Sequence, residues 1–133
     1  MPESASHAKL VSSLVQWIAA TYFAGDTGAI LVDSPTSNGK PPVVGGFVPD
    51  AFVDAGKIMV IGEAKTWQDV ESRHTRDQLC AFLQWCRLDE QAVLVMAVPW
   101  PVTRLAAMIL RSLQRKHGCE SVRTVILDKL GGC

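Results

Sequence analysis

The amino-acid sequence predicts an α/β domain with a mixed central sheet flanked by helices. Short apolar runs rich in β-branched residues alternate with longer segments in which apolar residues recur every three or four positions. This pattern is typical of strands that alternate with helices. The chain has 133 residues, of which 48% are hydrophobic, enough for one compact core but not for two. We therefore expect a single domain over residues 1–133.

The first segment is predicted to be an amphipathic helix. Leu10, Leu14 and Ile18 recur at four-residue steps, which places them on one helical face. Ser4 or Ser6 can cap the start of this helix. The helix is therefore expected to bury one face against the sheet.

A short strand and a long loop are expected next. Residues 29–32 are apolar and bounded by turn residues, which favours a strand. Residues 33–49 are so rich in proline, glycine and serine that little regular structure is expected there. A loop of this length in a small domain is typically either disordered or functional.

A β-hairpin is predicted for residues 50–65. A strand that starts after Asp50 leads into a turn at residues 54–56, and residues 57–65 form the second strand. The centre of the second strand reads Ile-Met-Val-Ile and has no polar side. This strand is therefore expected to be central and covered on both faces.

The C-terminal half is predicted to contain two helices, each followed by a strand. Apolar side chains at i, i+3, i+4 and i+7 indicate a helix over about residues 69–88. A buried strand is expected at residues 92–98, then a helix that Pro101 opens and Gly118 stops, and a last strand at residues 122–127. The predicted order is helix, three strands, helix, strand, helix, strand.

Composition excludes several classes of function. The 13 Lys and Arg residues balance the 13 Asp and Glu residues, so the chain lacks the net positive charge of a histone-like coat protein. No apolar run approaches the length of a membrane span, and the N-terminus does not resemble a signal peptide. We expect a cytoplasmic protein without a membrane partner. The four cysteines lack the spacing of a zinc site.

Two opposite charges end the most apolar strand. Because successive side chains on a strand point to opposite faces, Glu63 and Lys65 are expected on one face and Gly62 and Ala64 on the other. The hairpin can bring Asp50, at the start of the preceding strand, close to Glu63. Two carboxylates could hold a divalent cation and the ammonium could bind an anionic oxygen, which is the set that phosphodiester hydrolysis requires. A salt bridge at the strand edge is the alternative interpretation.

The residues Pro49-Asp50 and Glu63-Ala64-Lys65 resemble the PD-(D/E)xK motif of the restriction-endonuclease-like nuclease superfamily. The resemblance extends to the order of elements, αβββαβ, with a further helix and strand at the C-terminus. It implies that Asp50, Glu63 and the carbonyl of Ala64 bind Mg²⁺, for which Mn²⁺ can substitute. It also implies that Lys65 positions the attacking water and the phosphate.

A polar stripe on the following helix supports the same resemblance. Glu71, His74 and Gln78 lie at i, i+3 and i+7, so the stripe is expected to face the metal site. Exonuclease-like branches of the superfamily carry a catalytic Gln on this helix with a Tyr four residues later. Gln78 matches the Gln, while Phe82 stands in place of the Tyr. An exposed helix face is the alternative interpretation of the stripe.

The sequence departs from the family at the first helix, where many members carry a Glu that binds metal. The only early glutamate here is Glu3, which is expected to precede the helix. His7 is interpreted as a surface residue and left outside the site. Trp100, between two prolines, is interpreted as a packing residue at a helix start in preference to a base-stacking platform.

Two functions of different classes follow from these residues. The first is a Mg²⁺-dependent nuclease that hydrolyses DNA, or less favourably RNA. The second is a nuclease-fold subunit that binds DNA or a partner protein with little or no catalysis. A homodimer is expected in the first case, because one site in so short a chain reaches only one strand of a duplex.

Overall fold

The computed structural model describes residues 5–35 and 39–128. Its elements follow the predicted order, with one short 3₁₀ helix added before the last helix. They are α1 (Ala5–Tyr22), β1 (Leu31–Val32), β2 (Ala51–Asp54), β3 (Met59–Ala64), α2 (Arg73–Cys86), β4 (Ala92–Ala97), η1 (Trp100–Val102), α3 (Thr103–Lys116) and β5 (Arg123–Leu127).

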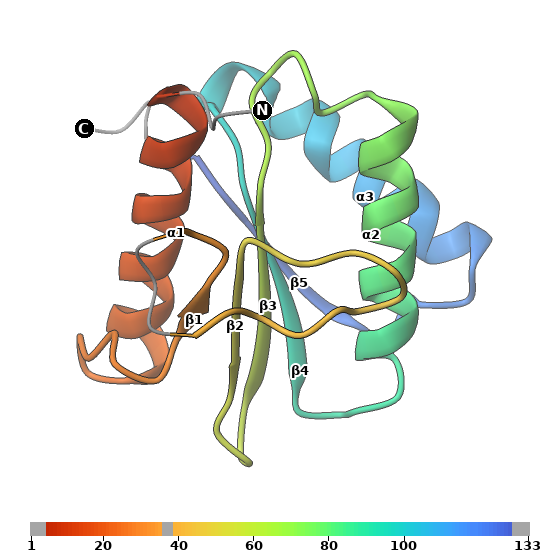
Figure 1. Ribbon diagram of the computed structural model, residues 1–133. Coiled ribbons are helices and arrows are strands. Elements are labelled where there is room, and N and C mark those ends of the chain that lie inside the picture. Colours follow the sequence, from red (N-terminus) through yellow and green to blue (C-terminus); the bar gives the residue numbers. More distant parts are fainter. Residues whose placement is uncertain (1–4, 36–38, 129–133) are drawn as a thin grey trace.

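The strands form one mixed sheet in the order β1-β2-β3-β4-β5. β1 and β2 pair antiparallel, as do β2 and β3, whereas β3, β4 and β5 run parallel to one another. Figure 1 shows α1 on one face of the sheet and α2 and α3 on the other. The predicted mixed sheet flanked by helices is confirmed.

β3 is the central strand and all six of its residues are buried. Met59 and Ile61 contribute to the cluster under α2 and α3, whereas Val60 and Ala64 contribute to the cluster under α1. This alternation leaves no face of the strand open to water, which explains why its sequence has no polar side. The expectation of a central strand covered on both faces is confirmed.

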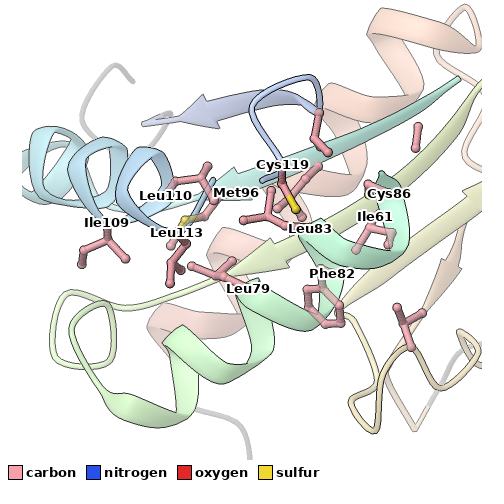
Figure 2. Close-up of a cluster of buried hydrophobic side chains, with 14 of the residues drawn as sticks. Ile61, Leu79, Phe82, Leu83, Cys86, Met96, Ile109, Leu110, Leu113 and Cys119 are labelled. Carbon is pink, nitrogen blue, oxygen red and sulfur yellow. The ribbon is translucent and has the colours of Figure 1, made fainter. Parts of the chain in front are cut away.

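The larger core lies between the sheet and the helix pair α2 and α3. Figure 2 shows side chains from both helices meeting those of the sheet, among them Leu79 and Phe82 of α2 and Ile109 and Leu113 of α3. Leu79, Phe82 and Leu83 are fully buried, as their helical spacing predicts. The helix that follows β3 is therefore held rigidly against the sheet.

Several predicted boundaries are wrong, and one of them is the start of α3, which begins at Thr103 and not at Pro101. The first strand spans only Leu31–Val32, and α1 already includes Ser6, which therefore cannot cap it, while Ser4 lies outside the described residues. The second helix begins at Arg73, because Ser72 caps it by accepting a hydrogen bond from the Thr75 N–H.

Among residues 5–35 and 39–128, none of the helices has both the length and the apolar character of a membrane span.

The described part of the long loop packs on α2. Val44 is buried in the larger core, and its backbone pairs with Phe47 in an isolated bridge. Gly45 has φ +60°, and a Cβ there would meet the Ala81 Cβ at 2.7 Å. The Phe47 ring lies edge-on to that of Phe82 at 6.5 Å. Of the two expected possibilities, disorder is therefore wrong for this part of the loop.

The approach of α1 to β3 depends on Gly62. A Cβ at position 62 would lie 2.9 Å from Cδ2 of Leu14, and Leu14 is fully buried. We expect Gly62→Ala to lower the free energy of unfolding by about 1–3 kcal/mol, because the core has no room for the added methyl group. Urea denaturation of the two proteins measures this difference.

Leu14→Ala provides the matched background, since it removes the atoms that the new Cβ would meet. Gly62→Ala should cost much less stability in that background than in the wild type. Equal costs in the two backgrounds would show that the helix and strand are not in close contact at this point.

Candidate active site

The register of the hairpin brings Asp50 and Glu63 together. Ala51 pairs with Gly62 across β2 and β3, so the residues immediately beyond this pair lie opposite each other. The Asp50 backbone N–H donates a hydrogen bond of 3.1 Å to Oε1 of Glu63. The predicted proximity of the two carboxylate residues is confirmed.

The Asp50 carboxylate has two further partners. Its Oδ2 accepts a hydrogen bond of 2.8 Å from the Ala64 backbone N–H and lies 3.3 Å from Nε2 of His7. Because the N–H and C=O of a strand residue point to the same side, the Ala64 carbonyl is directed to the Asp50 side of β3. The Asp50 carboxylate and the Ala64 carbonyl therefore lie on the same side of this strand.

Lys65 and Gln78 complete the cluster from the α2 side. Nζ of Lys65 lies 3.1 Å from Oε2 of Glu63 and donates a hydrogen bond to Oε1 of Gln78. The Lys65 side chain is only 11% exposed, and Gln78 is buried. The Lys65 ammonium therefore has fixed partners and a single orientation. The structure thus brings together Asp50, Glu63, Lys65 and Gln78.

Glu63 is the electrostatic centre of this cluster. Its side chain is 3% exposed, and burial together with the negative charge of Asp50 raises its pKa from 4.5 to about 8, although Lys65 opposes the rise. Desolvation outweighs the ion pair, because the full solvation of a carboxylate is lost and only one cation replaces it. The protonated form of Glu63 is therefore favoured far more than that of an exposed glutamate, and a further positive charge would favour the ionised form.

The predicted polar stripe is only partly correct. Because α2 begins at Arg73, Glu71 lies before the helix and is exposed. His74 is also exposed, and its ring lies 5.5 Å from that of Phe47 on the long loop. Of the three stripe residues, only Gln78 contacts the other predicted site residues.

Phe82 belongs to the core. It is fully buried and lies one helical turn beyond Gln78. Its ring packs edge-on to Phe47 and has no polar atom to offer to a substrate. A Phe at this position therefore strengthens the contact between α2 and the long loop.

His7 is the residue that sequence reasoning left out. It comes from the first turns of α1 and is only 24% exposed at its side chain. The signal that could have found it is its place on the buried stripe of the helix, since His7, Val11, Leu14 and Ile18 follow three- and four-residue steps. Glu3, the other early polar residue weighed for the site, lies outside the described residues.

The oxygen atoms at this site are of the type that binds a hard divalent cation. Asp50 and Glu63 supply carboxylate oxygens and Ala64 a main-chain carbonyl, the ligands that Mg²⁺ prefers. The residues described do not include a group of three or more His, Cys, Asp and Glu side chains arranged to hold a metal ion. A cation at this site would therefore be held by the two carboxylates, the carbonyl and ligands from outside the protein.

Comparison of the chain with protein-family models, curated proteins and solved structures gives no match. The geometry of the cluster and the motif that its residues form are therefore the features that point to a function.

The raised pKa of Glu63 predicts how the stability of the metal-free protein depends on pH. The folded state holds a proton on Glu63 that the unfolded state releases above about pH 4.5. The stabilisation is therefore present at low pH and is lost as the pH rises from about 4.5 to about 8. Glu63→Gln removes this titration. In that window the free energy of unfolding of the variant should therefore rise relative to that of the wild type, by at most about 1.4 kcal/mol per pH unit.

Urea denaturation from pH 5 to pH 9 in excess chelator measures the difference between the two proteins. Asp50→Asn should move the loss to lower pH, because it removes the second cause of the shift. Glu90→Gln, which replaces an exposed carboxylate away from the cluster, is the control for the loss of one surface charge. An offset between Glu63→Gln and the wild type that does not change with pH would contradict the prediction.

Proposed function

We propose that this protein is a metal-dependent nuclease that hydrolyses phosphodiester bonds of DNA, with RNA as the less favoured substrate. The observation that carries the proposal is that the Asp50 and Glu63 carboxylates and the Lys65 ammonium meet at one end of the central strand. The order of elements and the spacing of these residues support a restriction-endonuclease-like core of the PD-(D/E)xK type.

Asp50, Glu63 and the carbonyl of Ala64 are the residues that would hold Mg²⁺ or Mn²⁺. Such an ion would polarise the phosphate and lower the pKa of a bound water. Two structural features suit the carboxylates to this role. The Ala64 N–H and His7 orient the Asp50 carboxylate, and the Asp50 N–H orients that of Glu63. Both carboxylates are thus set before a substrate arrives, which lowers the cost of organising the site.

Lys65 and Gln78 supply the remaining polar groups. The Lys65 ammonium, held between Glu63 and Gln78, can offset negative charge that develops on the phosphate oxygens. Gln78 keeps that ammonium in place and offers an amide to the water or phosphate. A fixed cation loses no rotamer freedom on binding the substrate, which favours the transition state.

The second candidate, a nuclease-fold subunit that binds without cleaving, differs in one measurable respect. It would bind DNA or a partner protein through the same end of the sheet but would not hydrolyse phosphodiester bonds. The homodimer likewise stays a prediction, and light scattering at the assay concentration tests it.

Nicking of supercoiled plasmid is the direct test of catalysis. We expect cleavage with Mg²⁺ or Mn²⁺, none in excess chelator, and none with Ca²⁺, whose larger size and looser coordination align a water poorly. Lys65→Ala should reduce the rate by about 100-fold or more, because it removes a cation that acts on the transition state.

Lys57→Ala is the matched control, since Lys57 is exposed in the hairpin turn at the opposite end of β3. It should cleave at the wild-type rate. Undiminished cleavage in chelator would contradict the metal mechanism. DNA binding without cleavage under any divalent ion would favour the non-catalytic subunit.

A further inference from the structure

Two tryptophan side chains stand in solvent at the end of the sheet that carries the candidate site. Trp67 is 63% exposed and Trp100 is 62% exposed, so the interpretation of Trp100 as a packing residue is wrong. Each lies three residues beyond a strand end, at Ala64 and Ala97, and these alanines are partners in the parallel pair β3 and β4. Figure 1 shows the segments that follow the two strands at the same end of the sheet.

The backbone that carries Trp67 is fixed. The Asp69 N–H donates to the Thr66 carbonyl at 3.0 Å, and Oγ1 of Thr66 donates to Oδ2 of Asp69 at 3.0 Å. Val70 is fully buried and anchors the turn in the larger core. Trp67 is therefore displayed by a rigid turn.

Trp100 is displayed in the same manner. Pro99 and Pro101 restrict the backbone on both sides of it. The Val102 N–H donates to the Pro99 carbonyl at 3.1 Å, and Oγ1 of Thr103 donates to the Trp100 carbonyl at 2.9 Å. The ring thus stands on a short, well-bonded 3₁₀ turn.

The other two tryptophans have a different environment. Trp17 and Trp85 pack against the cores, and their rings lie 5.9 Å from Tyr22 and 5.8 Å from Phe52. Among the residues that the structure describes, no aromatic ring packs against Trp67 or Trp100. Their faces are available to a ligand.

We propose that Trp67 and Trp100 form a stacking surface for unpaired nucleobases and that the substrate class is single-stranded DNA. This inference rests on the proposed nuclease function. Both tryptophan segments start beside the site, because Lys65 lies two residues before Trp67 and its N–H donates to the Ala97 carbonyl on β4 at 3.0 Å. Bases inside a duplex are already stacked, so two exposed indole faces select bases that are not.

Two exposed arginine side chains could bind the phosphates of the strand. Arg73 and Arg104 are exposed and lie in the first turns of α2 and α3, the helices that follow the two tryptophan segments. Exposed aromatic faces combined with basic side chains are the usual means of holding a single strand without reading its sequence. The chain has no net charge, so stacking has to supply a large share of the affinity.

Fluorescence anisotropy of a labelled oligothymidine in excess chelator tests the surface without cleavage. Trp67→Ala and Trp100→Ala should each raise Kd about tenfold, and Trp100→Phe should retain most of the affinity, because a phenyl ring still stacks. Leu88→Ala is the matched control, since Leu88 is 79% exposed and precedes β4 at the opposite end of the sheet. It should bind as the wild type does.

An abasic strand of the same length separates stacking from phosphate contact. The wild type should bind it more weakly than oligothymidine, whereas the Trp67→Ala, Trp100→Ala double variant should bind both equally. Unchanged Kd values for the single variants, or an equal loss on both strands, would overturn the stacking surface. So would self-association that depends on the two rings, with no oligonucleotide binding, because it would assign them to a protein contact.

The nicking assay, run in parallel with cleavage of a circular single-stranded DNA, distinguishes this failure from that of the proposed function. If the wild type cleaves with Mg²⁺ and both alanine variants bind the single strand normally, the stacking surface is overturned but the proposed nuclease function is not. Ring-dependent binding of oligothymidine without cleavage under any divalent ion would support the surface and overturn the nuclease.

Discussion

The antiparallel register in which Ala51 faces Gly62 is the constraint on which the candidate site depends. It places Asp50 beside Glu63. On the α2 side Glu63 pairs with Lys65, whose ammonium also donates a hydrogen bond to Gln78. If β3 slipped by one residue, the Glu63 carboxylate would turn to the α1 face, and the small residues Gly62 and Ala64 would face α2. The hydrophobic pattern of β3 resists such a slip, because both of its faces are packed.

Burial sets the electrostatic character of the cluster. A carboxylate inside a protein loses its hydration, and here a single ammonium and a backbone N–H compensate Glu63 only in part. The result is a carboxyl group whose pKa is raised and whose ionised form would be stabilised by a second positive charge. Carboxyl groups perturbed by burial and by a neighbouring charge are common at functional sites.

The chemically distinctive residues gather at one end of the sheet. Glu63 and Lys65 lie at the carboxyl end of β3, and Trp67 and Trp100 lie beyond the carboxyl ends of β3 and β4. Open α/β sheets commonly place their ligands outside these ends, where loops diverge and helix N-termini begin. The opposite end has the hairpin turn and Leu88, which makes it a natural source of control variants.

The sequence by itself determined the order of helices and strands, the central position of β3 and the facing of Asp50 and Glu63. These features follow from local periodicity and from the length of one hairpin, and both are readable along the chain. Tertiary structure decided the contact of His7 with Asp50 and the exposure of Trp100, because both depend on how segments distant in sequence pack. It also decided how the long loop packs on α2, because a contact between two separate segments leaves no periodic pattern in the sequence.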